Sequence, residues 1–218
     1  MRHAAGIIAG SVAIVALAIV IGFVSAKVPS RPLNSFAAAF LKRLESMSHT
    51  DVISEISTPW QARQYLLNYL SYASDRDTYG EEDFIAPFRR IHAMRRDDCD
   101  GGALAAAALL SDNGYNPLML CMYSNEHTLE RKGGHSVYIY PEGGKWATLG
   151  IRPHDCNPPV FDSVEEIVRF YGFQKFAVVN IEEVCPDWIE GASNMSEKLY
   201  RPDLAKNIIG ARTIFLMD

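Results

Sequence analysis

The sequence predicts an α+β domain in which a helical N-terminal part packs on a small antiparallel sheet, preceded by one N-terminal transmembrane helix. Three observations lead to this fold class. Residues 4–26 form an uncharged apolar run, apolar residues recur at helical spacing between residues 34 and 113, and short β-prone runs separated by turn signals follow. The length of 218 residues suits one domain with one substantial core.

The composition is that of a globular protein. Hydrophobic residues make up 48% of the chain and charged residues 22%, which supplies enough apolar area to offset the entropy of the chain. The net charge is only -5, and no stripe of basic residues interleaved with aromatic residues occurs. We therefore expect no nucleic-acid partner.

Residues 4–26 predict a segment that enters a membrane. At about 1.5 Å per residue, a helix of this length spans a hydrocarbon core of about 30 Å. The run is longer than the apolar part of a usual signal peptide, which favours a retained anchor over a cleaved signal, although Val24-Ser25-Ala26 would suit signal peptidase. Residues 27–33 carry two prolines and form a linker. We expect the domain over 34–218, with its core at about 58–181, to lie outside the cytoplasm.

Four helices are expected before the first strand, over residues 34–47, 58–73, 81–94 and 99–113. Thr58 is a natural N-cap for the second, since Pro59 fits the first helical position. Pro87 bends or delays the third. The fourth is alanine-rich and apolar on most sides, and it ends before Gly114, so it should be central and buried.

Strands are expected after the fourth helix, over residues 117–123, 135–140, 145–151 and 176–181. The segment "PEGG" between the second and third of these strands predicts a tight hairpin. A helix over 162–172 begins at Asp162 or Ser163 and stops at Gly172.

Cys99 is the candidate nucleophile, because it stands at the head of the buried fourth helix. Unpaired backbone N–H groups and the positive end of the helix dipole lower the pKa of a thiol placed there. Gly101 and Gly102 keep the first turn slim, so that a backbone or a substrate can approach the sulfur. The flanking aspartates at 97, 98 and 100 act the other way if they lie close, since their charge raises the pKa of the thiol.

His135 is the candidate base, because a thiol nucleophile needs a histidine within hydrogen-bond reach. It follows Gly133-Gly134 and opens the strand "HSVYIY", which leaves little bulk in front of its ring. The other histidines have weaker settings, and each of them is better explained as a structural or solvated residue.

The order of these features resembles the transglutaminase-like superfamily, a branch of the papain-like thiol enzymes found in bacteria and archaea. The similarity rests on "RRDDCDGGALAAAALLSDNGYNPLML" and "GGHSVYIYPEGGKWATLG", extends upstream to "TPWQARQYLLNYLSYASDRD", and covers residues 58–171. Members commonly show an Asp-Cys-acidic segment at the head of a helix, a histidine that opens a strand, and a Trp-containing strand that ends in aspartate. The resemblance implies Cys99 as nucleophile and His135 as general base.

The third residue of the family's triad is not where the pattern expects it. A hairpin that turns at Glu142-Gly143 places Gly150 opposite His135, and longer turns bring Ile151 or Arg152 there instead. None of these three is a carboxylate. Asp155 is the first choice for an orienting group that reaches back from the following loop, with Asn157 as the fallback and Asp162 as a further alternative.

Two functions from different classes follow. The first is a membrane-tethered, cysteine-dependent hydrolase of peptide amides, or an acyltransferase, that acts on a peptide or protein substrate through Cys99 and His135. The second is a catalytically degenerate module of the same fold that binds a peptide or cell-envelope partner, and Gly150 favours it. No CxxC or HxxxH spacing predicts zinc, and no cofactor is required. Calcium at the aspartates 97, 98 and 100 stays open, because some periplasmic members of the superfamily depend on it.

Overall fold

The computed structural model describes residues 35–123, 134–191 and 193–195. The predicted anchor over 4–26 and the linker over 27–33 lie outside these residues. Among the helices within the described ranges, none combines the length and the apolar character needed to cross a bilayer.

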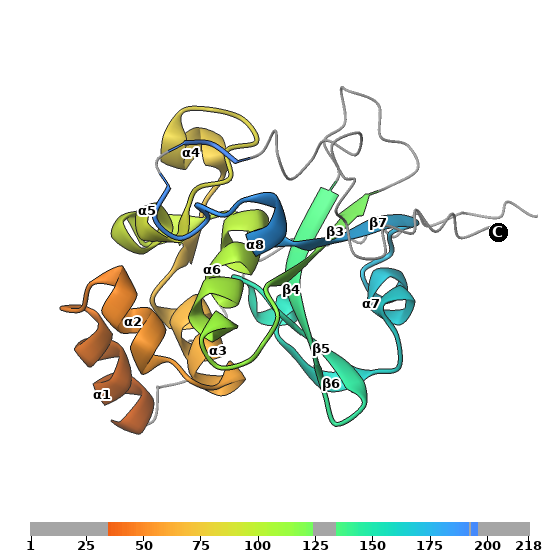
Figure 1. Cartoon of the computed structure of the whole chain (residues 1–218), viewed down its shortest axis with the longest axis horizontal. Helices are drawn as coiled ribbons and strands as arrows, with labels where there is room; N and C mark the ends of the chain where they lie inside the picture. The colour runs from red at the N-terminus through yellow and green to blue at the C-terminus, as the bar shows by residue number, and fades with distance from the viewer. Residues whose placement is uncertain (1–34, 124–133, 192, 196–218) are drawn as a thin grey trace, which may run out of the picture. The chain divides into compact units, whose positions relative to one another are not determined.

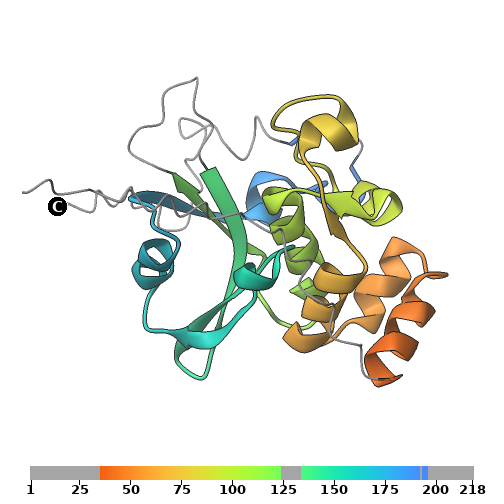
Figure 2. The ribbon, with the colours of Figure 1, turned by 180° about the vertical axis from the view of Figure 1, so that it is seen from behind.

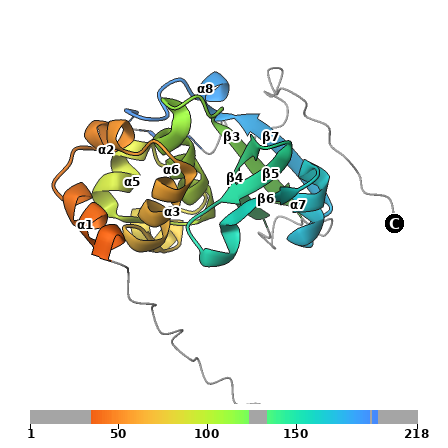
Figure 3. The same cartoon turned by 90° about the horizontal axis from the view of Figure 1, so that it is seen from below.

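The described chain is an α+β fold in which a helical N-terminal part packs on a five-stranded antiparallel sheet. Helix α6 (Cys99–Ser111) lies between the other N-terminal helices and the sheet, and it packs mainly on strand β4 (Gly134–Glu142) (Figure 1). The same layering is visible from behind and from below (Figures 2 and 3). Helix α7 (Val164–Phe170) covers the opposite face of the sheet. The predicted fold class is therefore confirmed for the described part of the chain.

The helical part contains short helices around α6. The remaining helices are α1 (Ser35–Leu44), α2 (His49–Glu55), α3 (Pro59–Asn68), α4 (Asp75–Tyr79), α5 (Phe88–Met94) and α8 (Ile181–Val184), with a 3-10 turn η1 (Pro153–Asp155).

The main sheet has the strand order β6-β5-β4-β3-β7, and all neighbours are antiparallel. Its other strands are β3 (Leu118–Tyr123), β5 (Lys145–Leu149), β6 (Asn157–Phe161) and β7 (Lys175–Asn180). A separate parallel pair joins β1 (Ser71–Tyr72) to β2 (Arg96–Asp97). This pair places Tyr72 directly opposite Asp97. Since Asp97 lies two residues before Cys99, the pair holds the chain after α3 next to the start of α6.

Alternation along the strands divides the core into two clusters. On β4, Tyr138 and Tyr140 pack with the helical side, whereas Val137 and Ile139 pack with α7. Helix α6 is buried from Asp100 to Leu110, as its alanine-rich sequence predicts. A helix buried on all sides cannot move easily, so the residue at its head is held in a fixed position.

Several helix ends follow the expected signals. Thr58 and Gln61 form a capping box at the start of α3, with Pro59 in the first turn. Ser163 is the N-cap of α7, and Gly172 follows the helix with a φ of 77°.

Other boundaries were predicted wrongly. The third helix does not begin at Glu81; it spans only Phe88–Met94, because Pro87 stands at the N-cap and delays the start. The second predicted helix stops at Asn68 instead of continuing to Ala73, since Ser71 and Tyr72 pair with β2. None of the short elements α2, α4, β1, β2, β6 and α8 was predicted from the sequence, and each of them is at most seven residues long.

The hairpin between β4 and β5 turns one residue later than the preferred register. Glu142 pairs with Lys145, so the turn consists of Gly143 and Gly144, with φ values of 60° and 78°. A two-residue hairpin turn of this type needs positive φ at both central positions, which two glycines provide. Continued along the strands, this register places Arg152 opposite His135, and the placement of Gly150 there is wrong.

Candidate active site

Cys99 is the first residue of α6, and it is partly exposed. The Asp98 side chain caps the helix by accepting a hydrogen bond from the Asp100 backbone N–H at 3.1 Å. A Cβ atom on Gly102 would lie 2.9 Å from the backbone nitrogen of Ile151, so this glycine lets the chain after β5 approach the first turn. At Gly102, the space expected in the first turn of α6 is thus occupied by the backbone of the chain after β5.

The surroundings of Cys99 favour the neutral thiol. Burial raises its pKa well above the ordinary value, and the charges of Asp100 and Asp98 raise it further. A hydrogen bond from the Ser136 backbone and the charge of Arg152 act in the opposite direction but are outweighed. A thiolate at this position therefore needs a proton acceptor beside it.

His135 and Asp155 form a buried pair. The distance from His135 Nε2 to Asp155 Oδ1 is 2.8 Å, and the exposed fractions of the two residues are 7% and 0%. Because a carboxylate only accepts hydrogen bonds, the neutral form of the ring that fits this contact carries its proton on Nε2 and its lone pair on Nδ1. Burial alone would raise the pKa of Asp155, but its contacts with His135 and Arg152 hold the pKa below the ordinary value.

Arg152 joins this pair from the loop after β5. Its Nε donates to Asp155 Oδ2 at 3.2 Å, and one terminal nitrogen lies 3.1 Å from His135 Nδ1 and 3.2 Å from Nε2. Its guanidinium also lies over the Tyr72 ring, 5.2 Å from the centroid. The sequence indicated Arg152 only as a residue that could pair opposite His135 and predicted no function for it.

The loop that presents Asp155 is held by close packing and by a buried hydroxyl. A Cβ atom on Gly150 would lie 2.6 Å from Asp155 Cβ, so only glycine leaves room for the aspartate. Thr148 Oγ1 donates to the backbone oxygen of Asp155 at 2.8 Å. Gly150 is therefore not a sign that the orienting carboxylate is lost, because its small size makes space for the carboxylate of Asp155.

The two alternatives to Asp155 lie elsewhere. Asn157 donates from Nδ2 to Thr148 Oγ1 at 2.9 Å and to the His154 backbone oxygen at 3.1 Å, and so it supports the loop instead of His135. Asp162 forms an exposed ion pair with Lys145. Of the three candidates, Asp155 is the one whose carboxylate bonds to the His135 ring.

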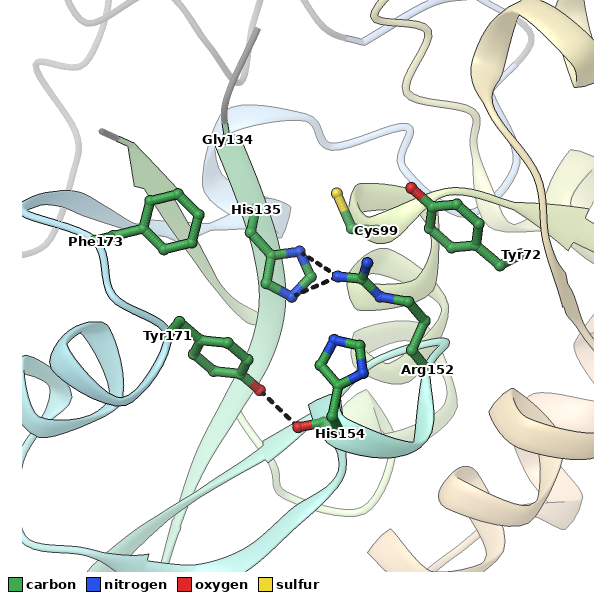
Figure 4. Close-up of a pocket in the computed structure, with 8 residues that line it drawn as sticks. All are labelled: Tyr72, Cys99, Gly134, His135, Arg152, His154, Tyr171 and Phe173. Carbon is green, nitrogen blue, oxygen red and sulfur yellow. Dashed lines mark hydrogen bonds between the residues drawn. The ribbon is translucent and has the colours of Figure 1, made fainter. Parts of the chain in front are cut away.

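These side chains surround a pocket of about 430 Å³ between the head of α6 and the start of β4. Figure 4 shows the Cys99 sulfur and the His135 ring directed toward the same space, with the Arg152 guanidinium beside both. The Tyr171 ring stands edge-on to His135, with 5.2 Å between the centroids. The described residues that line the pocket are Tyr72, Cys99, Gly134, His135, Arg152, His154, Tyr171 and Phe173.

Two groups of side chains could in principle hold a metal ion. The carboxylates of Asp75, Asp97, Asp98 and Asp100 have ligand atoms within 4.8 Å of one another, and oxygen-only ligands of this kind suit calcium. His135, His154 and Asp155 also bring ligand atoms within 4.8 Å. The Arg152 cation contacts two of these three residues, which disfavours a second cation among them.

The remaining cysteines do not join the site. Cys121 and Cys185 are buried in the core, and Cys156 donates to the Gly150 backbone oxygen at 3.2 Å. None of the four cysteines, all of which lie in the described residues, is in a disulfide. His92 is also structural: its ring bonds to Tyr65 Oη at 2.9 Å and stacks on aromatic neighbours.

Sequence reasoning missed the contributions of Tyr72, Arg152 and Tyr171. For Arg152 a signal existed, because the Gly143-Gly144 pair favours the hairpin register that places it opposite His135. Tyr72 and Tyr171 reach the pocket through tertiary packing, and no local pattern marks them.

Comparison of the sequence with models of protein families and with curated proteins gives no match. The candidate site therefore rests on its own geometry.

Proposed function

We propose that this chain is a transglutaminase-like, cysteine-dependent enzyme that cleaves peptide amides or transfers their acyl group. The observation that carries the proposal is the buried Asp155–His135 pair, which leaves His135 Nδ1 as the lone-pair nitrogen in the pocket that holds Cys99. Nucleophile, base and orienting carboxylate are the three roles of a thiol-enzyme triad.

In the proposed reaction, His135 Nδ1 takes the proton of the Cys99 thiol as the sulfur attacks the carbonyl carbon of an amide. The resulting imidazolium is stabilised by Asp155 and gives its proton to the leaving amine, so that a thioester remains on Cys99. The Cys99 backbone N–H, at the start of a helix, is positioned as a donor to the oxyanion. Water activated by His135 then releases a carboxylic acid, whereas an amine in place of water gives a new amide.

The second candidate is a peptide-binding module without chemistry. Two observations favour it: the Arg152 nitrogen lies against the Nδ1 atom that must accept the proton, and burial with Asp98 and Asp100 raises the pKa of Cys99. An enzyme would have to displace Arg152 from His135 before the thiol could react.

We further propose that residues 4–26 tether the domain to a membrane and that the domain faces the outside of the cytoplasm. The uncharged apolar run supports the tether. Membrane fractionation after carbonate washing tests it, since a mature chain beginning at Lys27 would show a cleaved signal instead.

The catalytic proposal is tested with full-length protein and a proteome-derived peptide library whose amines are blocked. Products are identified by mass spectrometry in ¹⁸O water, with and without a primary amine. New peptide ends that contain ¹⁸O show hydrolysis, and amine adducts show transfer. Both must vanish in Cys99→Ala and persist in Cys185→Ala, which removes a buried thiol that does not line the pocket. A folded wild-type protein that yields no product dependent on Cys99 would favour the binding module.

A further inference from the structure

The pocket around Cys99 presents cationic and neutral donor groups to an incoming ligand. Among the described residues that line it, Arg152, His135 and His154 carry or can carry positive charge, and none is a carboxylate. The Arg152 side chain is 34% exposed and that of His154 is 58% exposed, so both are accessible from the pocket. A ligand with a negative group is favoured by this lining.

The buried carboxylate of Asp155 lies within 3.3 Å of a nitrogen of each of these three side chains. Asp155 accepts from His135 Nε2 at 2.8 Å and from Arg152 Nε at 3.2 Å, and its Oδ1 lies 3.3 Å from His154 Nε2. When His135 takes a proton, two positive charges share this single negative charge. The site then has positive charge in excess, on the side that faces the pocket.

Among the described residues, no carboxylate accepts from the terminal nitrogen of Arg152 that faces His135. This nitrogen lies 3.1 Å and 3.2 Å from the two nitrogens of His135. The lone-pair directions of these nitrogens diverge in the ring plane, and Nε2 already donates to Asp155, so one guanidinium nitrogen cannot form an aligned hydrogen bond with both. A guanidinium pairs far better with a carboxylate, which takes two parallel hydrogen bonds.

We propose that Arg152 binds a carboxylate next to the scissile amide, so that the substrates are peptides with an acidic group within about one residue of the bond that is cleaved. This inference rests on the proposed function and adds its substrate class. A bound carboxylate draws the guanidinium away from His135 Nδ1 and frees that nitrogen to accept the Cys99 proton. The correct substrate thereby activates the base.

The carboxylate has two sources, the side chain of Asp or Glu and the free carboxyl end of a peptide. Both present the same planar group to Arg152. The Asp98 carboxylate acts on Cys99 and repels an anion, whereas burial raises the pKa of Asp100 and favours its neutral form, so a preference for anions at this sulfur originates from the Arg152 side of the pocket.

The test compares two reagents of nearly equal shape on full-length protein, iodoacetate and iodoacetamide. In each case the Cys99 sulfur displaces iodide and forms a thioether, while the thiol proton passes to His135 or to solvent. The ratio of the two labelling rates at Cys99, measured by mass spectrometry and divided by the ratio for N-acetylcysteine, reports the preference for an anion and cancels changes in thiol reactivity.

We expect a normalised ratio above one in the wild type and a fall of about tenfold in Arg152→Gln, the scale of one lost charge-assisted hydrogen bond. Arg152→Lys keeps the charge without the planar fork and should lie between. Arg63→Gln is the matched control, because Arg63 lines a different pocket. A ratio that is unchanged in Arg152→Gln overturns the inference and leaves the proposed enzyme standing. Absence of Cys99 labelling by either reagent overturns both.

A second arm distinguishes the sources of the carboxylate. Protection of Cys99 against iodoacetamide is measured with acetyl-Gly-Glu-Gly-amide, with acetyl-triglycine, and with acetyl-Gly-Gln-Gly-amide as the neutral reference. Stronger protection by the first peptide assigns a side-chain carboxylate, and stronger protection by the second assigns a chain end. If neither protects better than the neutral peptide, acidic substrates are excluded.

Discussion

A methyl group added at Gly150 should displace Asp155 from His135 while the protein stays folded. In Gly150→Ala the new Cβ would lie 2.6 Å from Asp155 Cβ and 3.2 Å from its Cγ and Oδ2. Ordinary carbon contacts begin near 3.5 Å, so Asp155 must move by about 1 Å. The His135–Asp155 bond, now 2.8 Å, would then exceed hydrogen-bond length.

The expected loss of activity follows from that displacement. A misplacement of about 1 Å costs about 10²-fold in turnover, and complete loss of an orienting carboxylate costs up to about 10⁴-fold. We expect Gly150→Ala to lower kcat by about 100-fold. Overpacking should also lower the free energy of unfolding by about 1–3 kcal/mol, which leaves a folded protein.

The assay is a double-mutant cycle on the amide substrates found with the peptide library, with urea unfolding measured in parallel. Asp155→Gly removes both the carboxylate and the Cβ that Gly150→Ala would strike. If the clash acts through Asp155, Gly150→Ala costs no further turnover in the Asp155→Gly background. Wild-type turnover in Gly150→Ala, or losses that add in the double variant, would refute the reasoning.

Three further predictions concern stability. Burial raises the pKa of Asp97 to about 7, so the folded state keeps a proton that the unfolded chain releases near pH 4. The free energy of unfolding should therefore fall by up to about 4 kcal/mol as the pH rises from 4 to 7. Urea unfolding in the presence of a chelator should show a smaller fall in Asp97→Asn, and an equal dependence on pH in the variant and the wild type would contradict the prediction. Gly102→Ala places a Cβ 2.8 Å from Ile151 Cβ and should cost about 1–3 kcal/mol, and an unchanged unfolding midpoint would show that the contact yields freely. Thr148→Val removes the hydroxyl donor to the buried Asp155 carbonyl and should cost about 1–3 kcal/mol, while Thr148→Ser, which keeps the hydroxyl, should cost clearly less.

Local sequence signals were sufficient for the elements that frame the site. The alanine-rich run after Cys99 marks a buried helix, and Thr58 with Pro59 marks the start of α3. Such features depend on neighbours within a few residues, through capping and burial periodicity, and these are present in the sequence itself. The placement of Cys99 at the head of α6 and of His135 at the start of β4 follows from them.

The sequence by itself determined the fold class, the head of α6 and Asp155 as the first choice to meet His135. Tertiary structure decided that Gly150 makes room for that carboxylate and that the Tyr171 ring contacts the His135 ring, and it brought Arg152, for which the turn residues gave only a register, into contact with the same ring. The physical reason for the two ring contacts is distance along the chain. The contacts of His135 with Arg152 and with Tyr171 join residues 17 and 36 positions apart, and short-range preferences do not fix how these side chains pack on β4. Gly150 and Asp155 are only five positions apart, but their close approach depends on the path of the loop between them.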